Sequence, residues 1–226
     1  SPMLNNVGFA LACEKMLGVT VPERCQWYRM ILGELARMSD HLTCDGAMAM
    51  ELGAFTPFLW MIKGREMIWE IMEEETGARL THSLGRVGGM AAPPTDGFKE
   101  HTRAVVKHIM QVLDEVERLL LGNRIFLDRL ENVGVISAED AISLGWTGPC
   151  LRAAGVPYDV RKAHPYLKYG EVEFDVPVGT NSDSFDRFAS GVLPDGMPVT
   201  QNRSPVVNYP YAKMRPILER LKNTGD

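Results

Sequence analysis

Residues 22–51 read PERCQWYRMILGELARMSDHLTCDGAMAME, and this stretch decides the fold class. Apolar side chains recur along it at intervals of three and four: Tyr28, Ile31, Leu32, Leu35, Met38 and Leu42. This spacing predicts one long helix from Pro22 to about Glu51 with a single buried stripe. Because such a stripe must pack against other helices, the stretch favours a helical bundle.

The sequence on both sides of this stretch continues the helical pattern. Upstream, a first helix ends at Leu17. Gly18 is typical of the residue that ends a helix by adopting the left-handed conformation. Downstream, Thr56 and Pro57 resemble a cap followed by proline in the first turn. We therefore predict a third helix over residues 58–76.

Further segments complete the predicted fold. Residues 105–120 carry another apolar stripe and predict a fourth long helix. Residues 124–130 and the segment capped by Ser137 predict short helices. Residues 171–176 alternate polar and apolar side chains, as a short strand or a half-buried extended segment does. The prediction is a mainly α fold, a bundle of long helices with short irregular β segments.

Neither a repeat nor a shift in composition divides the chain into two domains. We predict a helical core over residues 1–188 and an irregular, divergent tail over residues 189–226. The tail is rich in proline and asparagine, which predicts weak order, although residues 214–221 have a helical pattern. The first residue is not Met, which suggests a piece of a longer protein.

The composition excludes several classes of protein. With 45% hydrophobic and 23% charged residues, the chain is globular rather than disordered. Its net charge of -5 is spread along the chain without a basic block, so we expect no nucleic-acid partner. The longest apolar run, residues 58–62, is too short to span a bilayer, and no secretion signal is visible. Four cysteines without a CxxC pair indicate a reduced, cytoplasmic chain.

Common catalytic signatures are absent, so the sequence offers few candidates for chemistry. His41 and Cys44 lie three apart on the long helix and could share a metal, but two ligands alone favour a packed cysteine beside a hydrogen-bonded histidine. The 13 methionines either fill the core or line a channel for an apolar ligand.

The segment over residues 77–94 is the strongest candidate for a functional loop. It has no long period, and it holds Arg79, His82 and Arg86, whose charges could tune a buried anion or a redox centre. Just before it, residues 73–75 are three glutamates at a helix end that favours cations. We expect either basic neighbours there or a solvated acidic face.

Several stretches together resemble the hydrogenase-like D subunit of NADH:quinone oxidoreductase, or complex I, in the order of that family and over almost all of residues 1–188. They are SPMLNN (1–6), ELGAFTPF (51–58), TGAR (76–79), RVGG (86–89), GVISAEDA (134–141), TGPCLR (147–152) and FDVPVGT (174–180). The resemblance implies a fold like the large subunit of nickel–iron hydrogenases, without its metal ligands.

The resemblance also implies where the functional residues lie. Glu51, Thr56 and Phe58 match the wall of the quinone cavity, and Glu51 stands where many relatives have an aspartate. The loop that approaches the terminal iron–sulfur cluster of a partner subunit matches the residues Arg79, Thr81, His82 and Arg86. The quinone-site tyrosine of the family would lie directly before Ser1, and its histidine farther upstream.

By this resemblance, the chain helps to form the quinone-reduction cavity of a respiratory NADH dehydrogenase, with no catalytic residue and no metal of its own. Quinone binds at a shared site, and the cluster belongs to an iron–sulfur subunit beside other peripheral-arm subunits. The complex lies peripherally on the cytoplasmic side of the cell membrane. Two alternatives stay open: a non-catalytic assembly fragment, and a hydrogenase-related subunit of another membrane-bound redox complex.

Overall fold

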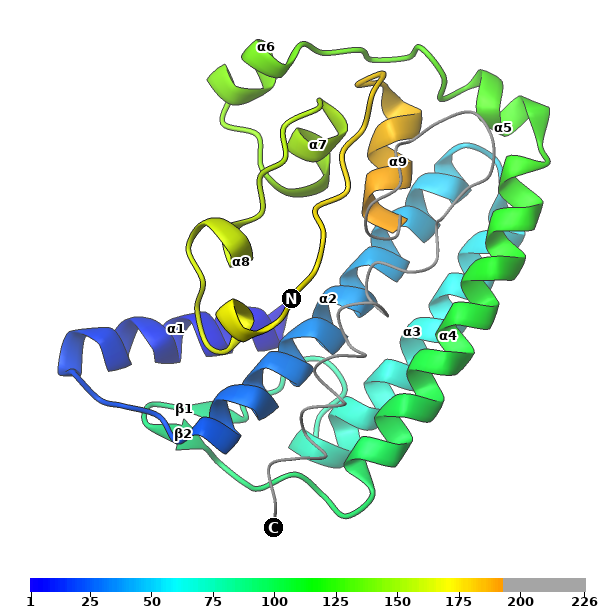
Figure 1. Cartoon of the computed structure of the whole chain (residues 1–226). Coiled ribbons are helices and arrows are strands. Elements are labelled where there is room, and N and C mark those ends of the chain that lie inside the picture. Colours follow the sequence, from blue (N-terminus) through cyan, green and yellow to red (C-terminus); the bar gives the residue numbers. More distant parts are fainter. Residues whose placement is uncertain (193–226) are drawn as a thin grey trace.

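The structure, a computed structural model, describes residues 1–192 and is mainly helical, as predicted. Three long helices run side by side, and shorter elements surround them (Figure 1). The elements are α1 (Pro2–Leu17), α2 (Glu23–Glu51), α3 (Phe55–Thr76), β1 (Gly85–Arg86), β2 (Gly89–Met90), α4 (Phe98–Leu121), α5 (Arg124–Asp128), α6 (Ala138–Ser143), α7 (Gly148–Ala153), α8 (Val160–Ala163), a 3-10 turn (Tyr169–Glu171) and α9 (Ser184–Val192).

The core lies where α2, α3 and α4 meet. A Cβ on Gly64 of α3 would be in ordinary van der Waals contact with both neighbours, 3.6 Å from Leu42 of α2 and 3.7 Å from Ile109 of α4. Ile109 is fully buried, and burial of such a side chain stabilises the fold by about 1.5 to 3 kcal/mol. The predicted stripes of α2 and α4 therefore form one shared core.

Most predicted helix ends are confirmed. Gly18 stops α1 with a φ of 66°, and α2 begins directly after Pro22. The predicted start of α3 was wrong: the helix begins at Phe55, and no side chain of residues 1–192 caps it. The Thr56 side chain does not cap α3. The turn between α2 and α3 is instead held by the backbone, where the Ala54 N–H donates to the Ala49 carbonyl at 2.8 Å.

The predicted short elements are confirmed in part. Ser137 caps α6 by accepting a hydrogen bond from the Asp140 N–H at 3.0 Å, and Asn123 caps α5 in the same way. Residues 172–176 form no strand, although Val172 and Phe174 are buried between exposed neighbours. The half-buried extended segment was thus the correct alternative.

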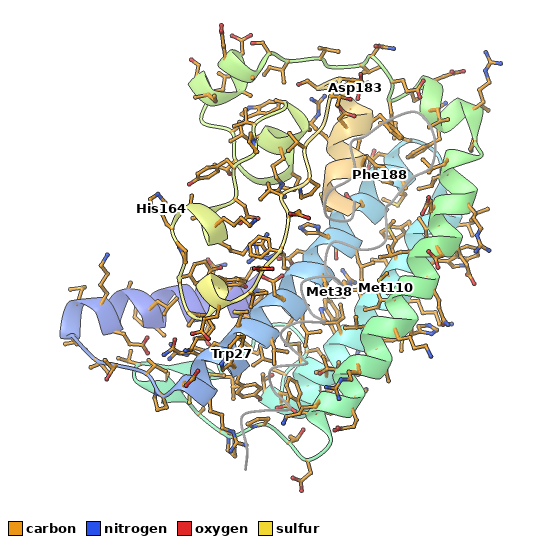
Figure 2. The ribbon with its side chains drawn as sticks, in the orientation of Figure 1. Trp27, Met38, Met110, His164, Asp183 and Phe188 are labelled. Carbon is orange, nitrogen blue, oxygen red and sulfur yellow. The ribbon has the colours of Figure 1, made fainter. Side chains whose placement is uncertain are left out.

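Helix α9 was not predicted, and it crosses the predicted boundary after residue 188. Asp183 caps it by accepting from the Asp186 N–H at 2.8 Å. Phe188 packs edge-on against Phe126 at 5.3 Å between ring centroids, where α9 lies against α2 (Figure 2). The boundary itself stays a prediction, and residues 193–226, with the predicted helical segment 214–221, lie outside the described residues.

Helix α1 lies beside the lower half of α2 (Figure 1). Its inner side buries Met3 and Val7, whereas its outer side exposes Phe9, Met16 and Leu17.

Among the helices within residues 1–192, none has the length and apolar character that crossing a membrane requires.

Candidate functional site

A hollow of about 340 Å³, which we call the central hollow, lies between α2, α3 and the loop that follows α3. Each of these three segments contributes to its wall, as do the first two residues of the chain. The lining includes Ser1, Pro2, Ser39, Asp40, Cys44, Arg65, Ile68, Trp69, Met72, Leu80 and His82. Apolar side chains such as Ile68, Trp69 and Met72 thus share the wall with polar and charged ones such as Ser39, Asp40 and Arg65.

His82 is one of two loop residues that enter this wall, together with Leu80. Only 8% of its surface is exposed, and its Nδ1 has no hydrogen-bond partner among the described residues. Burial lowers the pKa of the imidazole below its usual value, so His82 is neutral at pH 7. A neutral ring with an unused nitrogen at a hollow can donate to, or accept from, a bound polar group.

Arg65 supplies the positive charge of the same wall. Its guanidinium stacks over the Trp69 ring at 4.2 Å from the centroid, and it donates to the Thr43 hydroxyl at 3.2 Å. Its Nε is buried without a partner among residues 1–192. The side chain is therefore held in place while part of its hydrogen-bonding capacity stays unused.

Cys44 also borders the hollow, but as a neutral thiol. Burial and the neighbouring Asp45 raise the pKa of Cys44, so it is neither a thiolate nucleophile nor a ready metal ligand. Within residues 1–192, no three His, Cys, Asp or Glu side chains are grouped closely enough to hold a metal ion.

The residues predicted for the quinone cavity lie elsewhere, at the corner between α2 and α3. Glu51 and Thr56 are exposed there, and Phe58 packs with its ring 5.9 Å from that of Phe55. None of these predicted residues lines the central hollow. Cys44 is two helical turns from Glu51, so the corner and the hollow are roughly 10 Å apart along α2.

The loop residues predicted for the cluster have different surroundings from one another. Arg79 forms ion pairs with Glu66 and Glu73. Thr81 is exposed, His82 faces the hollow, and Arg86 is exposed on the hairpin of β1 and β2. The loop thus offers Arg86 and Thr81 to solvent, whereas the charge of Arg79 is balanced within the chain.

The three glutamates at the end of α3 have partners from other segments. Glu73 pairs with Arg79, and Glu74 contacts the His101 ring at 2.8 Å. Glu75 is buried and accepts hydrogen bonds from Tyr28 and Thr95. The prediction of basic neighbours is confirmed for the first two.

The buried arginines Arg29, Arg152 and Arg161 were not predicted. Arg29 on α2 binds Glu14 of α1 and the backbone of the hairpin, and Arg161 binds Glu34 and Asp159. An arginine inside the apolar pattern of α2 was the available signal for Arg29, because a buried charge requires a partner. Periodicity alone could not identify that partner.

The comparison with known families agrees with the sequence pattern. The sequence model of the family "respiratory-chain NADH dehydrogenase, 49 kDa subunit" matches residues 51–192. The chain belongs to this family. The chain is similar to the D 1 subunit of the NADH-quinone oxidoreductase of Sorangium cellulosum, which is 68% identical over 83% of the chain and 46% of its own length.

Two further relatives have similar coverage. The D 2 subunit of the enzyme of Anaeromyxobacter sp. is 52% identical over 83% of the chain and 44% of its own length. The D subunit of the enzyme of Myxococcus xanthus is 50% identical over 83% of the chain and 45% of its own length. The chain therefore spans less than half the length of these three relatives.

Proposed function

We propose that this chain forms part of the wall of a quinone-reduction cavity in an NADH:quinone oxidoreductase. The central hollow carries the proposal: it is large enough for a small ring, and α2, α3 and the His82 loop converge on it. The names of the relatives support quinone as the ligand of the whole complex. We infer that the corner residues Glu51, Thr56 and Phe58 extend the wall toward the entrance of the cavity.

The chemistry of the hollow suits a quinone. Trp69 and Met72 offer apolar contacts to a flat ring, and neutral His82 can donate a hydrogen bond to a carbonyl oxygen. When electrons arrive, negative charge develops on that oxygen, and the nearby Arg65 guanidinium favours it. In this proposal the chain binds and orients quinone, and it supplies no electron carrier.

The electrons come from a partner in this proposal. We place the exposed Arg86 and Thr81 beside the terminal iron–sulfur cluster of a smaller subunit in the peripheral arm, on the cytoplasmic side of the membrane. A positive charge near such a cluster stabilises its reduced form and so raises its reduction potential. The arrangement would therefore help electrons from NADH to reach the cluster next to the quinone.

Replacement of His82 in the assembled complex tests the proposal. His82→Leu should raise the KM for a short-chain quinone about tenfold, which is the loss of about one hydrogen bond of 1.4 kcal/mol. His164→Leu is the matched control, because His164 is exposed at the outer edge of the α8 loop (Figure 2). Equal quinone kinetics in both variants would refute a quinone site in the hollow.

A further inference from the structure

The hairpin of β1 and β2 carries Arg86, and buried charges hold it against α1 and α2. Figure 1 shows the hairpin below α1 and beside the start of α2. The Arg29 side chain of α2 is fully buried and makes two parallel hydrogen bonds to the Glu14 carboxylate of α1, at 2.7 and 2.9 Å. Such a paired contact fixes the plane of the guanidinium as well as its position.

The same two side chains bind the backbone of the hairpin. Arg29 Nη2 donates to the carbonyl oxygens of Arg86 at 2.7 Å and Gly89 at 2.8 Å. Glu14 Oε1 accepts from the Gly88 N–H at 2.7 Å. One buried ion pair thus satisfies three backbone groups across the turn, which lie 57 to 74 residues away in the sequence.

Arginine and glutamate are suited to this task. Arg29 reaches Glu14 and two carbonyl oxygens at once: Nη1 donates to Glu14 Oε2, and the two hydrogens of Nη2 are shared among Glu14 Oε1 and the carbonyl oxygens of Arg86 and Gly89. A lysine ammonium has one nitrogen and could not make the paired contact with both carboxylate oxygens. Gly88 turns the chain with a φ of 91°, a conformation that glycine adopts without strain. The hydrogen bond from Arg29 also keeps the pKa of Glu14 below its usual value, so the pair stays ionised at neutral pH.

Within the described part of the chain, the Arg86 side chain has no comparable support from the helices. Its Nη1 donates to the carbonyl of Ser83 at 2.5 Å, to the hydroxyl of Ser83 at 3.0 Å and to the carbonyl of Gly85 at 3.2 Å, all within the same loop. The guanidinium of Arg86 therefore moves with the hairpin. Whatever fixes the hairpin also fixes this charge.

We infer that Arg29 and Glu14 are positioning residues for Arg86, acting through the backbone of the hairpin. The inference rests on the proposed function, in which Arg86 raises the potential of the partner's cluster. It predicts that loss of the Arg29–Glu14 pair has the same electronic effect as loss of Arg86 itself, although neither residue of the pair reaches the surface of the hairpin.

The experiment compares Arg29→Met, Arg86→Met and the double variant in the assembled complex. A redox titration followed by electron paramagnetic resonance gives the midpoint potential of the terminal cluster. Both single variants should lower it, and the double variant should lower it no further than Arg86→Met does, because the two changes act on one charge. Arg29→Lys, which keeps the charge, should recover only part of the shift.

Arg161→Met is the matched control. Arg161 is also buried and also binds a buried glutamate, Glu34, but its ion pairs are with Glu34 of α2 and Asp159 before α8. Hydrogen exchange adds a readout that does not depend on the cluster: peptides covering residues 84–90 should exchange at least tenfold faster in Arg29→Met and at the native rate in Arg161→Met. Equal exchange, or an equal shift in potential, in these two variants would overturn the inference.

Failure of the inference can be distinguished from failure of the proposed function. If Arg86→Met leaves the midpoint potential unchanged, the proposed role of Arg86 is wrong, and with it the electronic role of the pair. If Arg86→Met shifts the potential while Arg29→Met does not, only the positioning inference is overturned.

Discussion

Asn6 of α1 provides a third attachment for the hairpin, and its removal should have a measurable cost. Its side-chain oxygen accepts from the Gly85 N–H at 2.7 Å, and its amide nitrogen donates to the Gly85 carbonyl at 3.3 Å. A methyl group in place of the amide breaks both hydrogen bonds. Asn6→Ala therefore releases β1 from α1 without adding bulk or charge.

The magnitude follows from these two contacts. Loss of two partly buried hydrogen bonds, at about 1 kcal/mol each, lowers the free energy of unfolding by about 2 kcal/mol. The better helix propensity of alanine raises it by about 0.5 kcal/mol. The free energy of unfolding should fall by about 1.5 kcal/mol, which for a chain of this size lowers the Tm by about 3 to 6 °C. Thermal unfolding of the full chain, followed by circular dichroism, measures this.

Asn5 is the control because it is the preceding residue on the same helix. Its side chain is exposed and makes one local hydrogen bond, to the Ser1 carbonyl at 2.9 Å. Asn5→Ala gains the same helix propensity and should change the free energy of unfolding by less than about 0.5 kcal/mol. If Asn5→Ala and Asn6→Ala had the same Tm, the Asn6 contacts would not stabilise the hairpin.

Four further substitutions test other parts of the fold. A Cβ on Gly179 would lie 2.9 Å from the Ala153 Cα, so Gly179→Ala should lower the free energy of unfolding in urea by about 2 to 3 kcal/mol. Gly8→Ala, on an open face of α1, should instead raise it by up to about 1 kcal/mol. Burial raises the pKa of Asp45 well above its usual value; because the folded-state pKa exceeds the unfolded one, stability falls as the pH rises above about 4. Asp45→Asn should flatten the decline in Tm between pH 5 and pH 8, and an unchanged slope would contradict the buried acid. Tyr28→Phe removes a donor to the buried Glu75 carboxylate and should shift the urea midpoint by the equivalent of about 1 to 2 kcal/mol; no shift would show that Thr95 alone suffices.

The long helices could be predicted from the sequence because many turns repeat one apolar stripe. In α2 and α4 the stripe extends over several turns; Pro22 precedes α2, and Gly97 and Gly122 flank α4. Short elements such as α7 and α8 contain at most two turns, so the same period has no room to appear. For α9 a local signal existed, since Asp183 precedes a helical spacing of Phe185 and Phe188.

The candidate site was predictable to a lesser degree. The unusual polar content of residues 77–94 identified the right loop, because polar groups in a loop are visible in the sequence. Their partners are not visible: Arg79 binds Glu66 on α3, and His82 joins a hollow formed mostly by α2 and α3. Such contacts depend on the angles at which helices pack together, and a local sequence pattern does not contain this information.

The exposed outer side of α1 makes Met16 a native reporter of assembly. Met16 is 87% exposed, whereas Met3 and Met30 have no exposed surface. Peroxide converts accessible thioethers to sulfoxides, so a brief treatment of the free chain should add one oxygen at Met16 before either buried methionine reacts. Any subunit that covers α1 would slow this reaction, so the mass of a single peptide can report whether this side of the helix is occupied.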